Sequence, residues 1–267
     1  MRADLQPAID VHGHYGRYLG DPHRHNNEFM SADGPMVAAR AAAASIQFTI
    51  VSPLQGLLPR RENHTFEANL HAAEMVAKTT GLLQYVVIDP RDPRTFDQAD
   101  EMLRLPRCVG IKIHPEEHCY PISEQGDPIF QFAAARKAVV LTHSGEQNSL
   151  PADFVPLVNR FPEVRLILAH IGCGWDGDMT HQVRAIQQTI HGNTFADTSS
   201  ARSVTPKLIE WAVREIGADR VLFGTDTPLY HTAMQRARID ESELSDHEKR
   251  LVLRENARLL FGAKYFQ

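Results

Sequence analysis

Short apolar runs recur along the chain; all but the third end in a polar residue, and each precedes a segment with helical spacing. From the third run onward the starts are separated by roughly 27 to 30 residues, the length of one strand, one helix and two loops. Near-continuous apolar strands that alternate with helices are typical of a parallel sheet covered by helices. We therefore expect eight strands, at residues 8–14, 46–52, 82–88, 109–114, 139–143, 166–170, 194–198 and 221–226.

Three of the intervening segments carry clear helix signals. Residues 61–80 place apolar side chains at intervals of three or four, and Gly81 follows as a stop. Thr205-Pro206 predicts the start of a helix that Gly217 ends. The residues Ser245 to Glu248 form a capping box that opens the last helix.

No linker, low-complexity tract or charge block divides the 267 residues. A barrel of eight strand–helix units commonly takes about 250 residues. We therefore expect one α/β domain over residues 1–267, a (β/α)8 TIM barrel, regular or distorted, with a long polar loop at 15–35 after the first strand. A doubly wound sheet is the alternative, but eight evenly spaced units favour closure.

Composition narrows the function classes. A net charge of −5 and a pI near 6.3 argue against a nucleic-acid binder or a membrane-surface protein. No apolar run approaches the roughly 20 residues that span a bilayer, and the first residues do not form a secretory signal. The three cysteines, Cys108, Cys119 and Cys173, fit reduced thiols in a cytoplasm. We expect a cytoplasmic protein that acts on a small molecule, with homo-oligomerisation left open.

Histidines gather where the predicted strands end. His12 and His14 are two residues apart in the first strand, so their imidazoles share one face. His143, His170 and Asp226 end three other strands, and in a barrel these ends meet at one face. Four imidazoles and a carboxylate offer the nitrogen and oxygen ligands that suit zinc, iron, manganese or nickel. The pattern predicts a metal centre.

At this point the chain resembles the amidohydrolase superfamily, in its amidohydrolase-related branch of small barrels. The resemblance spans nearly the whole chain and implies the barrel fold and metal chemistry. The branch contains hydrolases, lactonases, non-oxidative decarboxylases and hydratases. The matching motifs are IDVHGH at 9–14, GIKIHP at 110–115, LTHSG at 141–145, LAHIG at 168–172, FADTS at 195–199, RVLFGTDTP at 220–228 and ENARLLFG at 255–262.

The resemblance implies roles for the five candidate ligands. His12, His14 and His143 would bind the metal, and Asp226 would bind it and also act as a catalytic residue that takes a proton from bound water. His170 would bind a second metal or act as a catalytic residue that steers substrate or water. One or two divalent ions per chain are expected, zinc first, with manganese, iron or nickel as alternatives.

Strand 4 departs from the pattern of some relatives, which carry a bridging glutamate or carboxylated lysine there. Lys112 can carry a carbamate and bridge metals, or remain an ammonium that holds a substrate carboxylate. His114, on the same face, is a further bridging or substrate-binding candidate, or simply ends the strand before Pro115. Arg202, just beyond strand 7, is a candidate clamp for an anionic substrate.

We expect a metal-dependent hydrolase that cleaves an amide, lactam, lactone or ester bond in a small, carboxylated or neutral molecule. A divalent ion lowers the pKa of bound water to about 7, and a nearby carboxylate can accept the proton. The alternative is a metal-dependent non-oxidative decarboxylase, a carbon–carbon lyase of the same branch. A barrel that only binds a ligand is the third hypothesis, and the intact ligand set argues against it.

Overall fold

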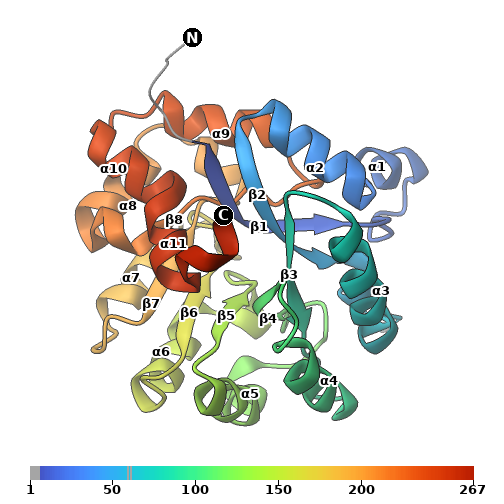
Figure 1. Ribbon diagram of the computed structural model, residues 1–267. Coiled ribbons are helices and arrows are strands. Elements are labelled where there is room, and N and C mark those ends of the chain that lie inside the picture. The colour runs from blue at the N-terminus through green and yellow to red at the C-terminus, as the bar shows by residue number, and fades with distance from the viewer. Residues whose placement is uncertain (1–6, 59, 61) are drawn as a thin grey trace.

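Eight parallel strands form one sheet in the computed structural model, which describes residues 7–58, 60 and 62–267. Neighbours in the sheet follow the order of the chain, from β1 to β8, and helices surround them (Figure 1). The expected (β/α)8 barrel is therefore confirmed. The strands are β1 (Ala8–Tyr15), β2 (Ile46–Pro53), β3 (Leu82–Val87), β4 (Cys108–Ile113), β5 (Val139–Thr142), β6 (Arg165–Leu168), β7 (Thr194–Asp197) and β8 (Val221–Leu222).

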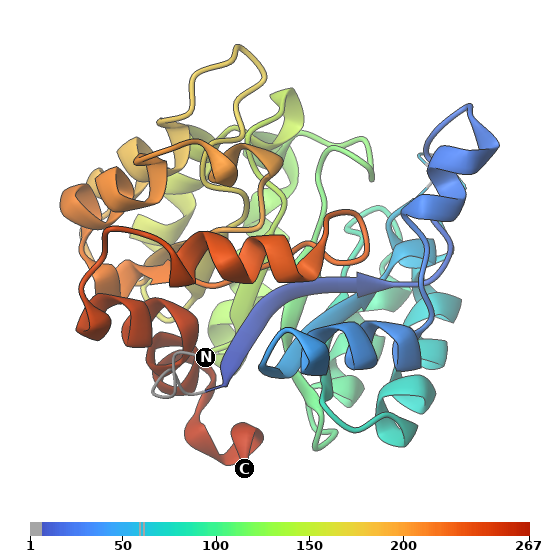
Figure 2. The same ribbon diagram turned by 90° about the horizontal axis from the view of Figure 1, so that it is seen from above.

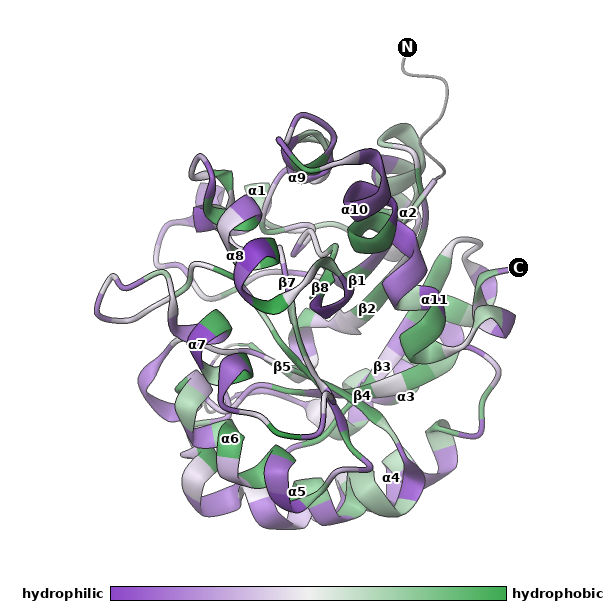
Figure 3. Cartoon of the chain, turned by 90° about the vertical axis from the view of Figure 1, so that its left-hand side faces the viewer, coloured by the Kyte–Doolittle hydropathy of each residue, from purple (hydrophilic) through white to green (hydrophobic). Residues whose placement is uncertain are grey.

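The helices pack against the outside of the sheet and turn their polar faces outward (Figure 3). Apolar residues also fill the barrel interior, where the Tyr85 hydroxyl donates a hydrogen bond to the Val11 carbonyl over 2.8 Å. The helices are α1 (Arg24–Phe29), α2 (Gly34–Ala43), α3 (Thr65–Lys78), α4 (Arg94–Met102), α5 (Ile122–Arg136), α6 (Pro151–Arg160), α7 (His181–Gln187), α8 (Leu208–Ile216), α9 (Thr232–Asp240), α10 (Asp246–Arg250) and α11 (Asn256–Phe261).

The barrel is distorted where it closes, between β8 and β1. Strand β8 has two residues, and the segment after it continues along β1 through a parallel bridge between Gly13 and Thr227. The Val11 amide donates to the Phe223 carbonyl over 2.9 Å, and the Phe223 amide donates to Val252 in the π-helical turn Leu251–Glu255. This closure brings Asp226 beside the histidines of β1.

Two of the three helix predictions need correction. Helix α3 begins at Thr65, and the predicted start at residue 61 lies outside the described residues; Gly81 follows the helix with φ +85°. Helix α8 begins at Leu208 rather than at Thr205-Pro206, because Lys207 has a left-handed φ of 65° and interrupts the helix there. Its end before Gly217 is confirmed.

The capping box of the last helix is also confirmed, with Ser245 and Glu248 each accepting from the other's backbone amide. Beyond this box the helical segment continues, but with a change of pitch. The π-helical turn Leu251–Glu255 separates α10 from α11.

Six of the eight strands end earlier than predicted, among them β5, β6 and β8. His143 lies one residue beyond β5, His170 two beyond β6 and Asp226 four beyond β8. His170 and Asp226 have φ angles of 71° and 56°, in the left-handed region, so the chain turns sharply at both residues. These turns direct the two side chains across the barrel mouth instead of along the strand.

The segment after β1, expected to be a long polar loop, contains regular structure. Gly16 pairs with Ala32 across it, and α1 lies between them, at the far end of β1 from the C-terminus (Figure 2). Among the described helices, none is both long and apolar enough to cross a membrane. The three cysteines are free thiols.

Candidate metal centre and active site

A cavity of about 360 Å³ opens at the end of the barrel where the strands finish. Its floor is polar and consists of side chains from the strand ends, whereas one wall is aliphatic. The lining residues are His12, His14, Tyr18, Leu54, Leu57, Leu58, Lys112, His114, Glu117, His143, Glu146, His170, Cys173, Ser200, Asp226, Leu229 and Tyr230. Seven of the eight predicted site residues are in this set; Arg202 is not.

The two histidines of β1 converge on one carboxylate. Nε2 of His12 lies 3.2 Å from Nε2 of His14, and Asp226 Oδ1 lies 3.5 Å and 3.1 Å from these two nitrogens. The intervening residue is glycine because the strand is tightly enclosed: a Cβ on Gly13 would lie 2.5 Å from the Thr49 methyl carbon. The His-Gly-His spacing thus reflects both the alternation of the strand and its packing.

The proton positions of these two rings depend on their other nitrogens. His12 Nδ1 lies 2.8 Å from Asp197 Oδ2, so Nδ1 donates there and His12 Nε2 presents a lone pair. His14 Nδ1 lies 2.8 Å from the Ser52 hydroxyl and 3.3 Å from the Ser52 carbonyl oxygen, so either ring nitrogen of His14 can carry the proton, and Nε2 can donate to Asp226 Oδ1. With the His14 proton on Nδ1, three acceptors converge as a divalent cation requires, so the residues present fit a metal.

Electrostatics keeps the ligands in their binding forms. Burial, together with the nearby Lys112 charge, lowers the pKa of His12 well below its usual value, so the ring is neutral. Burial by itself would raise the pKa of Asp226, but the His14 hydrogen bond and the neighbouring histidines outweigh it and lower that pKa. A neutral imidazole and an ionised carboxylate are the forms that bind metal.

Asp10 holds the Asp226 turn against β1. Its Oδ1 accepts from the backbone amides of His12 and Thr225, both over 3.0 Å, and its Oδ2 accepts from the Thr225 hydroxyl over 2.6 Å. The Asp226 amide in turn donates to the His12 carbonyl over 2.8 Å. Asp10 is therefore a structural acid beneath the site, and burial raises its pKa to about 7.

Lys112 projects from β4 into the floor of the cavity. Its Nζ donates to His12 Nε2 over 2.9 Å, and the residue is only 1% exposed. A purely structural role would pair Lys112 with Asp10 or Asp197. Within the described residues, neither carboxylate forms a salt bridge with Lys112. Burial lowers the pKa of Lys112 to about 8, against the attraction of Asp226 and Asp197.

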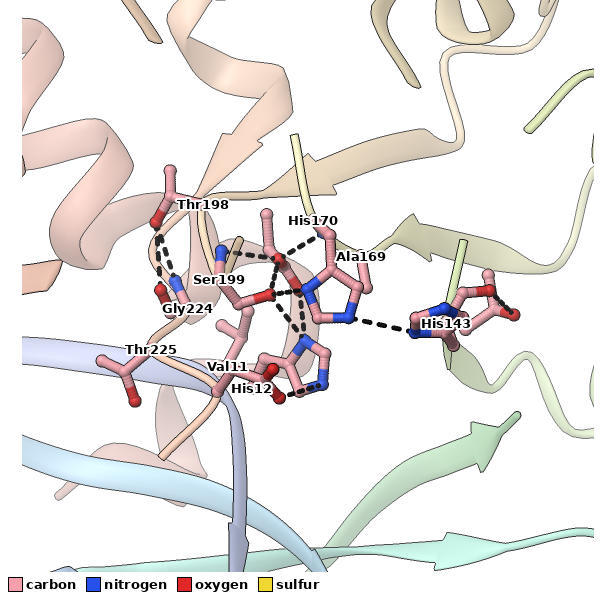
Figure 4. A network of polar contacts seen from close by, with 12 residues as sticks. Val11, His12, His143, Ala169, His170, Thr198, Ser199, Gly224 and Thr225 are labelled. Atoms are coloured by element: carbon pink, nitrogen blue, oxygen red, sulfur yellow. Dashed lines mark hydrogen bonds and ion pairs between the residues drawn. The ribbon is translucent and has the colours of Figure 1, made fainter. Parts of the chain in front are cut away.

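A second group of ligand-type side chains lies beside the first. Ser199 sits between the rings of His12 and His170 (Figure 4), with its Oγ 2.9 Å and 2.8 Å from their Nδ1 atoms. Ser199 also donates to Asp197 Oδ1, which accepts the His170 amide over 2.9 Å. His12, His170 and Asp197 thus form a second possible metal-binding group. Burial lowers the pKa of His170 to about 4.

His143 extends the network toward the opening of the cavity. Its Nδ1 lies 3.1 Å from His170 Nε2, and its Nε2 donates to Glu146 Oε2 over 2.7 Å. The His114 ring stacks on it, with ring centres 4.2 Å apart and planes 8° apart. His114 Nδ1 accepts the Glu117 amide over 3.2 Å, so its proton is on Nε2.

Two surface arginines, one of them the candidate clamp Arg202, lie outside this network. Arg202 is exposed in the 3-10 turn after β7, near Cys173 but not in the cavity lining. Arg24, in the segment after β1, is exposed and pairs with Glu28 over 2.7 Å. Cys173 does line the cavity.

Sequence reasoning missed the residues that orient the ligands. Ser52, Asp197 and Ser199 each contact a site histidine, and Glu146 pairs with His143. Two of them could have been found from their positions in the sequence. Asp197 ends β7, where an inward carboxylate is expected to face the site, and Glu146 follows His143 by three residues. Nothing in the sequence distinguishes Ser52 from other strand-end serines.

A comparison with protein-family models now decides the family. The family described as Amidohydrolase matches residues 9–263. The chain belongs to the amidohydrolase family. A comparison with curated proteins gave no match.

Solved structures share the fold of this amidohydrolase-family protein. They include a 2,6-dihydroxybenzoate decarboxylase from Rhizobium, 15% identical, with a TM-score of 0.74 over 97% of this chain and 99% of that one. A dihydroxybenzoic acid decarboxylase from Polaromonas, solved with manganese and 2-nitroresorcinol, is 17% identical, with a TM-score of 0.74 over 96% and 97%. A Staphylococcus aureus protein with only the general description amidohydrolase is 14% identical, with a TM-score of 0.70 over 96% and 99%.

Proposed function

We propose that this amidohydrolase-family protein is a metal-dependent, non-oxidative decarboxylase that removes carbon dioxide from a small carboxylated ring compound in the cytoplasm. The observation that carries the proposal is the buried ammonium of Lys112 on the cavity floor, beside the lone pairs of His12. The decarboxylases among the similar structures support this chemistry more than the hydrolysis expected first.

Lys112 favours a substrate that carries a negative charge. A buried ammonium without an ion-pair partner is costly, and an incoming carboxylate would compensate its charge. A neutral ester or amide offers no such compensation. The lysine therefore favours an acid as substrate, and as an ammonium it would orient the carboxylate rather than bridge two metals as a carbamate.

The upper cavity favours an apolar ring. Leu54, Leu57 and Leu58, from the segment after β2, face the cavity together with Leu229. Stacked His114 and His143 lie among the other lining residues and add two parallel rings. An aliphatic wall over a charged floor suits a flat apolar body with a carboxylate at one end.

His12, His14 and Asp226 would hold the ion, with His143 and His170 beside them. When bound, a divalent ion would supply positive charge that orients the substrate oxygens and stabilises the negative charge left as the carboxylate departs. We propose one ion per chain, manganese as the first choice because a similar decarboxylase binds it, with zinc as the alternative.

Asp226 is placed to move the proton that the reaction consumes. Decarboxylation replaces a carboxylate on carbon by a hydrogen, so one proton must reach that carbon. Asp226 Oδ1 faces the histidines, whereas its Oδ2 receives no hydrogen bond from any residue in the described part of the chain. An ionised Asp226 can take a proton from a substrate hydroxyl or from water and return it to the carbon.

A panel assay with two readouts tests the proposal against hydrolysis. Manganese-loaded protein is offered ortho-hydroxybenzoates on one side, and lactones, esters and amides of similar size on the other. We expect carbon dioxide release from members of the first group and no acid release from the second. Acid release from the second group alone would establish the hydrolase and reject the decarboxylase.

A further inference from the structure

The cavity is electrically asymmetric from its floor to its opening. The floor side chains are nearly inaccessible: His12 is 0% and Asp226 7% exposed. Nearer the opening, the Glu117 and Glu146 side chains are 16% and 39% exposed. We refer to Glu117 and Glu146 as the rim carboxylates.

Each rim carboxylate has one oxygen available. Glu117 Oε1 accepts from Arg60 Nε over 3.1 Å, and Glu146 Oε2 accepts from His143 Nε2 over 2.7 Å. Glu117 Oε2 and Glu146 Oε1 receive no hydrogen bond from residues in the described ranges. Both side chains line the cavity, so a bound molecule can reach them.

Arg60 does not cancel the negative charge at the opening. Its Nη1 lies 3.3 Å from Glu116 Oε1, and Glu116 Oε2 accepts the Asn148 amide over 3.0 Å, outside the cavity lining. Glu116 and Glu117 both contact this one guanidinium, and the charge of Glu146 lies near it, whereas the floor holds Lys112 and the proposed divalent metal against the single carboxylate of Asp226. The field therefore runs from a positive floor to a negative rim.

We propose that the substrate is dipolar, with a carboxylate on the floor and an amino group or another strong hydrogen-bond donor directed at the rim carboxylates. This inference rests on the proposed function only in taking the floor as the carboxylate site. A protonated amine at the rim would gain charge-assisted hydrogen bonds to the free oxygens of Glu117 and Glu146. An equally sized apolar group would leave these oxygens without a donor and displace their water.

The test compares two probes that differ by one group, 4-(aminomethyl)benzoate and 4-ethylbenzoate. Both carry the same carboxylate and ring, and they differ only in an ammonium or a methyl at the far end. Calorimetry with the manganese-loaded full chain should give the ammonium probe an affinity about tenfold higher. Glu117→Gln should remove most of this preference, chiefly by weakening the binding of the ammonium probe.

Glu124→Gln is the matched control, because Glu124 is exposed in the first turn of α5 and loses the same charge away from the cavity. It should keep the preference of the wild type. Equal affinities in the wild type, a preference for 4-ethylbenzoate, or a preference that survives Glu117→Gln would overturn the dipolar substrate. These binding results do not depend on turnover, whereas the decarboxylase fails if no ortho-hydroxybenzoate releases carbon dioxide.

Discussion

The ammonium nitrogen of Lys112 lies 2.9 Å from Nε2 of His12, the same imidazole nitrogen that faces His14 and Asp226. A metal bound by His12 would use the lone pair that now accepts the lysine proton. Lys112 and the metal therefore compete for one nitrogen, and metal binding would free the ammonium for a substrate carboxylate.

Lys112→Met should separate these two effects. The variant should bind manganese at least as tightly as the wild type, because the competing ammonium is gone. Its KM for carboxylated substrates should rise about 10- to 100-fold, the range expected for losing a charged hydrogen bond. Lys78→Met, at an exposed position near the end of α3, is the control. Wild-type kinetics in Lys112→Met would refute a role in substrate binding.

Metal content should depend in a graded way on the ligands and on the residues that orient them. Treatment with a chelator should abolish activity, and added metal should restore it.

His14→Ala should lose most of the metal. Asp197→Asn, which loosens the His12 ring, should lower the affinity for the metal about 10- to 100-fold. Elemental analysis measures both, with His25→Ala on exposed α1 as the control. Stoichiometric tight binding in His14→Ala would exclude the β1 pair as ligands.

Asp226→Asn should separate metal binding from proton transfer. The amide keeps the shape and one ligand oxygen, but it cannot carry a proton. We expect much of the metal to be retained and kcat to fall by roughly 10²- to 10⁴-fold, the range for losing general acid–base help. Asp219→Asn, which changes a carboxylate that is 71% exposed before β8, should have no effect. An unchanged kcat in Asp226→Asn would rule out the proton role.

The buried His118 should make the fold sensitive to acid. Its Nε2 donates to the Gly56 carbonyl over 2.9 Å, its Nδ1 has no partner in the described part of the chain, and burial lowers its pKa. A lowered folded-state pKa contributes stability that is present above about pH 6.5 and is lost as the pH falls.

His118→Gln removes this titration and retains a donor for Gly56. Metal-free wild type should therefore lose more stability between pH 7.5 and pH 5 than the variant does, as measured by chemical unfolding. His247→Gln, at an exposed position in α10, should behave like the wild type. Equal acid sensitivity in wild type and His118→Gln would show that His118 is not a source of acid lability.

The fold could be predicted because eight strand–helix units repeat with little variation, and β1 to β8 follow that order. The errors lie where local signals compete. Thr205-Pro206 has the pattern of a helix start, yet Thr205 closes the preceding 3-10 turn. In the π-helical turn Leu251–Glu255, the Val252 carbonyl accepts from the amide of Phe223, almost thirty residues earlier in the sequence, a contact that no local pattern reveals.

The candidate ligands could also be predicted, because parallel strand ends meet at one face of a barrel. Their orientation could not. The left-handed turns at His170 and Asp226 and the Ser199 hydroxyl between His12 and His170 are properties of the assembled barrel. Arg202 shows the converse: it follows β7 as an anion clamp would, but its side chain lies outside the cavity lining.

The most direct test follows the carboxyl carbon and the incoming proton in one experiment. An ortho-hydroxybenzoate that is turned over in the panel, labelled with ¹³C in its carboxyl group, is incubated with manganese-loaded protein in D2O and followed by NMR. The account predicts labelled carbon dioxide and a product with one deuterium on the carbon that lost the carboxylate, and neither after metal removal. If no panel acid gives labelled carbon dioxide while the same preparation hydrolyses a lactone, ester or amide, the decarboxylase account is contradicted.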